Sequence, residues 1–334
     1  MIEDYPVNIT TVARVLGFKP KTLYGWYRNY LSDYNTDKEQ GRWDDKKVDV
    51  VDEQTGEILK QKTIYIAKPE NVGFNMCLDD KEINHKSFTI LSNQDTGKIA
   101  FAMDSVKGIE LKKGIKFLGK CIQNIKSISC DMAPSYLNFC KTILPLALII
   151  IDKFHVMKYV YDAVQSVRMQ IRKDIFEQIP RGKRQKKDER LLTELEQLKK
   201  SKILLSKSKC QWNDEQSELM KTLFEKYPTL EIAYNLAQDF KKWYHKSNVK
   251  KPRLGIEKEL FLWYEKVEKS KIKEFEPCVK MIEKHEENII NYFYETQTNA
   301  KAERLNGKIE RFISNNYGVR DLDFSMYRIA GYFS

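Results

Sequence analysis

Val72-Gly-Phe-Asn-Met-Cys-Leu78 is a short apolar run that ends directly before a carboxylate, Asp79. The run Ile125-Lys-Ser-Ile-Ser-Cys130 has the same form and ends before Asp131. Short apolar runs of this kind are typical of strands buried in a sheet. A third carboxylate, Glu303, lies far downstream in a stretch with helical spacing. Together the three predict a site for divalent cations such as Mg²⁺, which take oxygen ligands and can be held in pairs around a phosphate.

The surrounding residues alternate between strand and helix signals, in the manner of an α/β domain. The turn Gln94-Asp-Thr-Gly97 separates two of the strand candidates as in a hairpin. Three strands followed by two helix–strand pairs predict a mixed sheet with flanking helices. The expected strands are 73–79, 86–92, 98–103, 125–131 and 146–152, and the expected helices are 107–122 and 134–143.

The N-terminal residues 9–28 have the pattern of a helix-turn-helix, although two short helices packed in a small core would give a similar pattern. Ala13 lets the helices approach, and Gly17 lets the turn adopt a positive φ. The apolar contacts of the motif would come from Val12, Leu16, Phe18, Leu23 and Trp26. The residues presented to a DNA groove would be Lys19, Lys21, Thr22, Tyr24 and Arg28.

Residues 153–290 lack strand signals and are rich in Lys, Glu, Leu and Gln, which predicts an all-helical segment. Its basic run 181–187 is either a solvated loop or a contact to a DNA backbone. In the second interpretation the contacts come from Arg181, Lys183 and Arg184. A helix is expected from Asn299 to about Asn315, with Glu303 beside its apolar face.

The composition favours an intracellular protein with a polyanionic partner. The chain carries 58 Lys and Arg against 47 Asp and Glu, a net charge of +11. Neutralising phosphates releases their counterions, so such an excess suits nucleic acid. None of the six cysteines forms a C-x-x-C pair, which argues against a zinc finger. No signal peptide is recognised, and the longest apolar run, 143–151, is too short to span a bilayer.

Several motifs together resemble one family. They are Asp131-Met-Ala-Pro-Ser-Tyr136, Leu144-Pro-Leu-Ala147, Asp152-Lys-Phe-His-Val-Met-Lys158, Ala302-Glu-Arg-Leu-Asn-Gly-Lys-Ile309 and Tyr317-Gly-Val-Arg320. The sequence in this way resembles the transposases of the ISL-three family of bacterial insertion sequences, over roughly residues 72–334. The resemblance implies an α/β, RNase H-like core of the DDE type, with a large all-helical insertion. Many relatives carry an N-terminal cysteine-rich zinc module, which this sequence lacks.

The resemblance places the two catalytic aspartates on Asp79 and Asp131 and the glutamate on Glu303. Asp80 follows the first aspartate, as an acidic residue commonly does in the family, and competes for the same ligand role. Asp152 also ends a predicted strand and is the alternative second ligand. Asp131 is preferred because the fourth strand of this fold lies next to the first.

Three further residues complete the expected site. His155 would contact the scissile phosphate or hold a catalytic carboxylate, unless it is a packed histidine at a helix start. Asn306 is a possible support to the site, and Lys308 would hold a DNA phosphate. The implied cofactor is a pair of Mg²⁺ or Mn²⁺ ions, which would activate water and later a DNA 3′-hydroxyl, and would stabilise the leaving oxygen.

These expectations give five segments. They are a helix-turn-helix over 1–30, a connector with a possible β-hairpin over 31–71, the first part of the catalytic core over 72–152, the helical insertion over 153–290 and the last part of the core over 291–334. The expected function is cleavage and joining of double-stranded DNA, at transposon ends and target, by at least a dimer in the bacterial cytoplasm, associated with the nucleoid. The alternatives are a domesticated, inactive DNA-binding protein and an RNase H-like nuclease.

Overall fold

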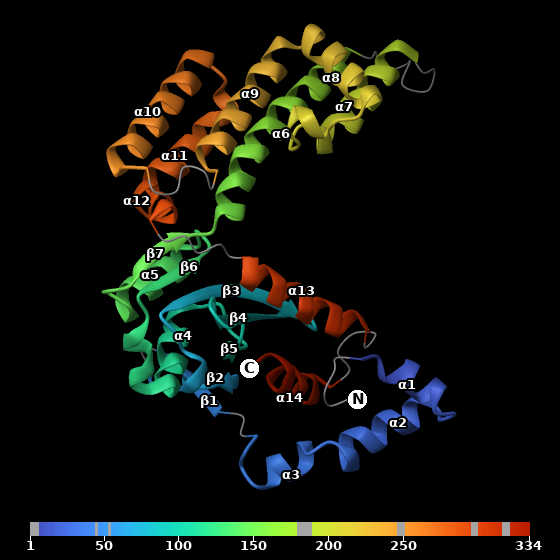
Figure 1. Cartoon of the computed structure of the whole chain (residues 1–334), viewed down its shortest axis with the longest axis vertical. Coiled ribbons are helices and arrows are strands. Elements are labelled where there is room, and N and C mark those ends of the chain that lie inside the picture. Colours follow the sequence, from blue (N-terminus) through green and yellow to red (C-terminus); the bar gives the residue numbers. More distant parts are fainter. Residues whose placement is uncertain are drawn as a thin grey trace. The chain divides into compact units, whose positions relative to one another are not determined.

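The structure is a computed structural model of the 334-residue chain (Figure 1). It describes residues 7–43, 46–52, 55–178, 189–245, 251–294, 300–315 and 321–334, without the side chains of 189–192 and 300–303. The chain divides into two compact units. Unit 1 comprises residues 1–150 and 297–334, and unit 2 comprises residues 151–296.

Unit 1 is built on a mixed seven-stranded sheet with the strand order β1-β2-β5-β4-β3-β6-β7. The strands are β1 (Lys46–Val51), β2 (Ile58–Ala67), β3 (Asn75–Ile83), β4 (Lys86–Asn93), β5 (Ile99–Met103), β6 (Ser127–Cys130) and β7 (Leu148–Ile151). β3, β4 and β5 form an antiparallel meander, and β6 runs parallel to β3 on its other side. The expectation that the first and fourth core strands are neighbours is therefore confirmed.

Strand β3 continues beyond the position that the sequence suggested. The prediction that this strand ends at Asp79 is wrong, because β3 stays paired with β4 from Met76↔Asn93 to Ile83↔Lys86. The two strands meet in a tight turn at Asn84 and His85, whose φ values of 51° and 58° suit a two-residue hairpin. The continuous apolar run ends before Asp79, but the strand goes on to the buried Ile83, because backbone pairing does not depend on an apolar side chain at every position.

The hairpin expected within 31–71 is present and is part of the main sheet. β1 pairs antiparallel with β2, and β2 pairs antiparallel with β5 through Ile64↔Met103 and Ile66↔Ala102. Ile64 and Ile66 are both buried. This segment therefore extends the sheet on its β5 side.

One face of the sheet, here called the first face, is covered by helices that lie between the strands in sequence. They are α4 (Gly108–Gly114), the 3₁₀ segment η3 (Ile115–Asn124) and α5 (Pro134–Ile143). Leu118 and Phe139 pack there against Ile128 of β6. The helix expected over 107–122 is interrupted at Gly119, which has φ +62°.

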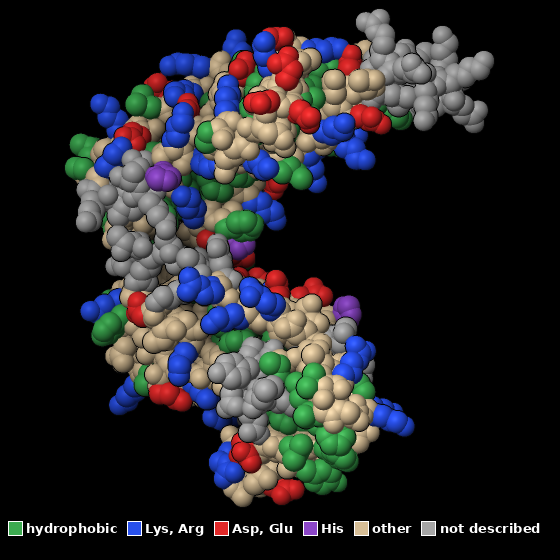
Figure 2. Space-filling view, turned by 45° about the vertical axis from the view of Figure 1, so that its right-hand side comes forward, with side chains coloured by type: hydrophobic (Ala, Val, Ile, Leu, Met, Phe, Trp, Pro, Cys, Tyr) green, Lys and Arg blue, Asp and Glu red, His purple; other side chains and the backbone are tan. Residues whose placement is uncertain are grey.

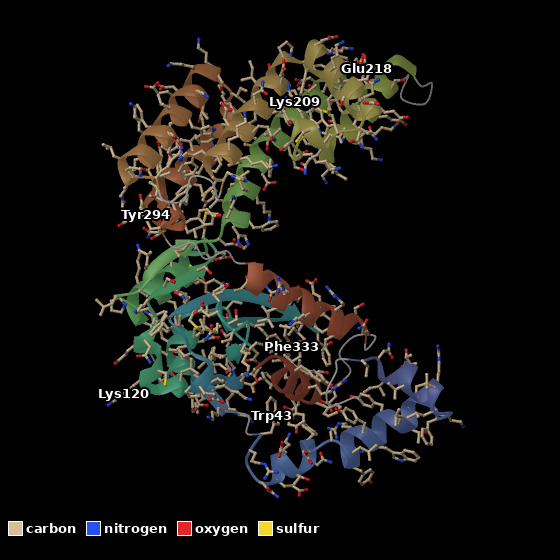
Figure 3. All side chains as sticks on the ribbon, in the orientation of Figure 1. Trp43, Lys120, Lys209, Glu218, Tyr294 and Phe333 are labelled. Atoms are coloured by element: carbon tan, nitrogen blue, oxygen red, sulfur yellow. The ribbon has the colours of Figure 1, made fainter. Side chains whose placement is uncertain are left out.

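The opposite face, the second face, is covered by the last two helices of the chain, α13 (Ala300–Asn315) and α14 (Leu322–Phe333). Ile309 of α13 and Ile329 of α14 join a buried cluster with Phe88 and Ile90 of β4. Phe333, labelled in Figure 3, belongs to the same cluster. Segments more than 200 residues apart in the sequence thus share this core.

The N-terminal helices pack on α14. They are α1 (Ile9–Val15), α2 (Pro20–Trp26), the π-helical turn η1 (Tyr27–Leu31) and α3 (Tyr34–Glu39). Phe324 of α14 is buried among Leu23, Tyr27 and Tyr34. Helix α14 therefore contributes to two cores, one under the sheet and one under the N-terminal helices.

From Asp152 onward, the regular elements in the described residues of unit 2 are all helices, as the sequence suggested. Its α-helices are α6 (Lys153–Gln178), α7 (Glu189–Leu204), α8 (Asp214–Lys226), α9 (Pro228–Trp243), α10 (Arg253–Ser270), α11 (Glu276–Lys284) and α12 (Glu286–Ile290). The indole N–H groups of Trp212, Trp243 and Trp263 donate to the carbonyls of Leu204, Ile256 and Leu236 at 2.9–3.1 Å. These bonds satisfy each tryptophan within the helical core. No helix in the described residues is both long enough and apolar enough to cross a membrane.

Candidate active site

The sheet brings two of the predicted carboxylates together. In the parallel pairing of β3 with β6, Leu78 lies opposite Cys130. The next residue of each chain segment is an aspartate, Asp79 within β3 and Asp131 directly after β6. Both are half-buried. Two neighbouring parallel strands thus carry the predicted aspartates at the same level of the sheet.

Strand alternation separates Asp79 from Asp80. Successive side chains of a strand point to opposite faces. Leu78 belongs to the first-face cluster and Ile83 to the second-face cluster, so Asp80 lies on the first face and Asp79 on the second. Helix α13, which carries Glu303, covers the second face. Asp79 is therefore the one of the two that shares a face with that helix.

Helix α13 contacts the Asp79 side chain directly. The Asn306 amide Nδ2 donates a 2.5 Å hydrogen bond to Asp79 Oδ2, while the Asp80 backbone N–H donates to Asp79 Oδ1 at 2.9 Å. One helical turn further, Glu310 forms an ion pair with Lys81. These contacts align α13 with β3, and they hold the Asp79 carboxylate through both of its oxygens.

Asp131 occupies the turn between β6 and α5. Its Oδ1 accepts the backbone N–H of Ala133 at 2.7 Å, and Pro134 then starts the helix with a φ already suited to it. This bond fixes the approach of the chain to α5, whose N-cap residue is Ala133. It uses one carboxylate oxygen.

Tyr136 of α5 is a site residue that the sequence reasoning did not single out, although it closes the quoted motif from Asp131. Its buried hydroxyl lies 2.9 Å from Thr89 Oγ1, which in turn donates to the Ser105 carbonyl at 2.5 Å. Burial raises the pKa of this hydroxyl, the Thr89 bond lowers it, and the charges of Asp80, Asp131 and Asp79 raise it further. The three carboxylates therefore act on one buried phenol, which stays protonated.

The Glu303 side chain lies outside the described residues. Its backbone is in α13, three residues before Asn306, and residues three apart share a helix face. Among the described residues, no group of three or more His, Cys, Asp or Glu is arranged to hold a metal ion. The two adjacent aspartates offer hard oxygen donors of the type that Mg²⁺ and Mn²⁺ prefer, so this donor set fits the implied ions.

Asp152 and His155 belong to unit 2, at the start of α6. His155 Nδ1 lies 3.4 Å from Asp152 Oδ2, and Asp152 Oδ1 accepts the Phe154 N–H at 3.1 Å. Asp152 thus caps the first turn of α6 and faces a histidine. Their catalytic roles stay predictions.

The N-terminal helices place the predicted DNA contacts in two groups. Lys19, Lys21 and Thr22 are exposed. Arg28 instead forms a 2.7 Å ion pair with Asp321, and the Tyr24 ring packs edge-on against Phe324. Within these described helices, the first group is open to a ligand, whereas the second contributes to the attachment to α14.

The apolar contacts expected in this module are only partly made. Leu23 is buried and Gly17 has φ +75°, as the pattern suggested. Leu16, Phe18 and Trp26 are 42–58% exposed, although the Phe18 and Trp26 rings contact each other edge-on with their centroids 5.4 Å apart. The module's core is completed by Phe324 of α14, which leaves these three side chains on the outside. Figure 2 shows apolar side chains gathered at the lower end of the view, where the N-terminal helices lie.

The remaining predicted DNA contacts are Lys308 and three residues of the basic run 181–187. Lys308 is exposed on α13. Arg181, Lys183 and Arg184 lie outside the described residues. Their interpretation as DNA contacts therefore stays a prediction.

These observations define an α/β protein whose mixed sheet carries two adjacent aspartates at the end of a parallel strand pair. A family model described as a transposase, the DDE type of the ISL-three family, matches residues 76–329. The match covers most of the chain, and the chain belongs to this transposase family. No curated protein and no solved structure matches it.

Proposed function

We propose that the chain is a DNA transposase that cleaves and joins DNA at insertion-sequence ends, with Asp79, Asp131 and Glu303 as its catalytic carboxylates. The observation that carries the proposal is the Asn306–Asp79 hydrogen bond beside the parallel pair of β3 and β6. It brings the helix of Glu303 to the strand that holds Asp79, next to Asp131. An RNase H-like core would assemble its three carboxylates in this way.

The chain's own residues would bind and orient the reacting groups. When bound, two Mg²⁺ or Mn²⁺ ions would supply activation of the nucleophile and stabilisation of the leaving oxygen. Asp79 and Asp131 would provide negative charge for these ions, and Asn306 fixes the direction of the Asp79 carboxylate. The Tyr136 hydroxyl stays protonated because it is buried, and the charges of Asp131 and Asp79 act on it. His155 and Asp152 are candidates for support of the scissile phosphate.

The proposed reaction has two steps, hydrolysis and strand transfer. In the first, a water oxygen attacks a phosphorus atom at the element's end, and the strand breaks to give a 3′-hydroxyl and a 5′-phosphate. In the second, that 3′-hydroxyl attacks a target phosphodiester, forming a new bond as the target's own 3′-oxygen leaves. Neither step needs a covalent enzyme intermediate.

DNA ends would be recognised by the N-terminal helices. Lys19, Lys21 and Thr22 are the exposed candidates, used as in a helix-turn-helix, and Lys308 would hold backbone phosphate. Pairing two ends requires at least a dimer. A protein with this activity would work on the bacterial chromosome, in the cytoplasm at the nucleoid.

The test is a cleavage and strand-transfer assay with purified Asp131→Asn on DNA that carries the element's ends. The substitution keeps the shape but removes a charge that the ions need, so both reactions should be lost while DNA binding persists. Normal cleavage by this variant, combined with loss in Asp152→Asn, would move the second ligand to Asp152.

The same assay separates the two alternatives. A wild-type chain that binds the ends without cutting them under any divalent ion would be an inactive DNA-binding protein. Cutting without joining would indicate an RNase H-like nuclease.

A further inference from the structure

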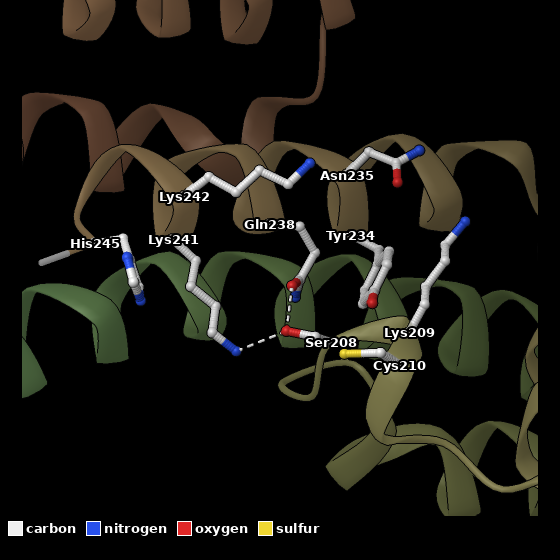
Figure 4. A pocket seen from close by; sticks show the side chains of 9 residues that line it. All are labelled: Ser208, Lys209, Cys210, Tyr234, Asn235, Gln238, Lys241, Lys242 and His245. Atoms are coloured by element: carbon white, nitrogen blue, oxygen red, sulfur yellow. Dashed lines mark hydrogen bonds between the residues drawn. The ribbon is translucent and has the colours of Figure 1, made fainter. Parts of the chain in front are cut away.

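Unit 2 contains a basic pocket that the proposed chemistry does not use. It lies between the loop after α7 and the second half of α9, and its volume is about 570 Å³ (Figure 4). Three of its lining side chains are lysines, and none is a carboxylate. The lining residues are Ser208, Lys209, Cys210, Tyr234, Asn235, Gln238, Lys241, Lys242 and His245.

The wall of the pocket is held in place by hydrogen bonds between the loop and α9. The Tyr234 hydroxyl donates to the Lys207 carbonyl at 3.0 Å, and Gln238 Nε2 approaches the same oxygen at 3.4 Å. Within the loop, the Ser208 N–H donates to Gln211 Oε1 at 3.0 Å as part of a capping box. The pocket is therefore a built feature of the fold, with its shape set before a ligand arrives.

Lys241 is the central cation of the pocket. Its half-buried ammonium lies 3.0 Å from Ser208 Oγ, as the dashed line in Figure 4 shows. Among the described residues, no carboxylate forms an ion pair with it. An ammonium has three donors, and Ser208 accepts one of them. Within the described residues, two of its donors thus remain for an anion.

Lys209 and Lys242 add charge at the rim. Glu231 Oε1 lies 3.9 Å from Lys209 Nζ, and Asp239 Oδ1 lies 3.8 Å from Lys242 Nζ. The two lysine side chains are 58% and 80% exposed, and such long, solvated pairs neutralise little charge. The rim is therefore open to a polymer as well as to a small ion.

The pocket lacks an open aromatic face for a nucleobase. The Tyr234 ring is 1% exposed and packs with Trp212 and Phe224. Without a stacking surface, lysine, serine and amide groups recognise phosphate and sugar, which positions a nucleic acid without reading its sequence.

We infer that this pocket binds a backbone phosphate of double-stranded DNA. Lys241 is the central contact, and Lys209 and Lys242 contact the flanking phosphates. The inference rests on the proposed function in one respect, since that function supplies DNA as the polyanion. It assigns unit 2 a role in binding DNA that is separate from the sequence recognition proposed for the N-terminal helices.

The first experiment measures duplex binding by the full chain in EDTA, where no cleavage occurs. Lys241→Gln keeps most of the side-chain stem and removes the charge. We expect several-fold weaker binding and a log–log salt slope reduced by about one unit, as for one lost phosphate contact. Lys221→Gln, an exposed lysine of α8 outside the pocket, is the matched control. Unfolding curves verify that both variants fold.

The second experiment uses a thiol of the pocket as a reporter. Cys210 is exposed, four other cysteines are buried, and Cys121 is half-buried. In a Cys121→Ser background, alkylation by N-ethylmaleimide therefore reports on Cys210. Saturating duplex DNA should slow this alkylation at least several-fold, and Lys241→Gln should weaken the protection.

The outcomes separate the pocket from the rest of the proposal. If the wild-type chain binds DNA but Lys241→Gln matches Lys221→Gln and Cys210 stays unprotected, the pocket inference fails and the transposase proposal stands. If inorganic phosphate protects Cys210 and duplex DNA does not, the ligand is a free phosphate and the inference also fails. If protection by DNA is found while no divalent ion supports cleavage, the pocket stands and the catalytic proposal fails.

Discussion

The two faces of the sheet in unit 1 are covered in different ways. The helices on the first face, α4 and α5, lie between strands of the sheet in the sequence, so this face is covered by local neighbours. The helices on the second face, α13 and α14, come after the whole of unit 2. Asp79 lies on the second face and Asp80 on the first. The comparison indicates that the candidate site is built on the face that depends on distant parts of the chain.

The largest expected effect comes from replacing Asp79 and Asp80, which are neighbours in the sequence, one at a time. Asp79→Asn should reduce strand cleavage by about 100-fold or more, because it removes charge on the second face where the proposed ions bind. Asp80→Asn should change the cleavage rate by only a few-fold. Single-turnover cleavage with Mg²⁺ measures both. A larger loss in Asp80→Asn would transfer the ligand to the first face and reverse the comparison.

The next effect concerns the hydrophobic clusters on the two faces of the sheet. Ile309→Ala on the second face and Leu118→Ala on the first each truncate a fully buried side chain. Each should lower the free energy of unfolding by about 2–5 kcal/mol. Denaturant unfolding measures this loss.

Activity then distinguishes the two faces. At a temperature where both variants are folded, Ile309→Ala should also slow cleavage, because α13 carries Asn306 and Glu303. Leu118→Ala should cleave at nearly the wild-type rate. Equal losses of activity would mean that the second face has no special relation to the site.

A smaller effect is expected from removing the hydrogen bond between Asn306 of α13 and Asp79. Asn306→Ala removes a hydrogen bond to a charged group, which is worth about 1.5–3 kcal/mol. If the bond orients the carboxylate, cleavage should fall by about 10-fold with DNA binding unchanged. Asn315→Ala, at an exposed position on the same helix, is the control. A wild-type rate for Asn306→Ala would show that the bond is only structural.

The smallest effect concerns the attachment of the N-terminal helices to α14. Asp323 accepts hydrogen bonds from Lys38, Tyr34 and Trp43. Burial raises the pKa of its carboxyl, but these three bonds outweigh burial, so the pKa lies below its ordinary value. A lowered pKa gives stability that is present at neutral pH and lost as the pH falls through the folded-state value.

Asp323→Asn should therefore destabilise the protein by about 1 kcal/mol at pH 7. The difference from wild type should shrink below about pH 4, the ordinary range of an aspartate. Thermal unfolding between pH 3 and pH 7 measures it, with Glu39→Gln as an exposed control on the same helices. A difference that stays constant with pH would contradict the role of this carboxylate.

The sequence predicted the elements that depend on local pattern. The strand candidates near 86–92, 98–103 and 125–131 agree with β4, β5 and β6 within two residues, and α5 begins and ends as expected. The neighbouring positions of Asp79 and Asp131 followed from the strand order that the family resemblance implies. The positions of these strands and of α5 need only a buried apolar run or a helix start signal, both of which are visible in one segment.

Other features depend on partners that no local pattern reveals. The extension of β3 past Asp79 comes from pairing with β4, and the exposure of Leu16 and Trp26 comes from a core completed by Phe324. The hydrogen bond from Asn306 to Asp79 joins residues 227 positions apart. Tyr136 was overlooked because a lone tyrosine gives no signal until its neighbours are known.

The helices that cover the second face are synthesised long after the strands of the sheet. The strands of the sheet are complete at Ile151, but α13 and α14 follow only after the 151–296 segment has been made. At about 5–20 residues per second, the interval is on the order of ten seconds. During it Phe88 and Ile90 have no helix to cover them, and we expect ribosome-bound chains halted near residue 296 to bind a chaperone or a hydrophobic dye more strongly than released chains. Equal binding by halted and released chains would mean that another segment shields this face until its own helices arrive.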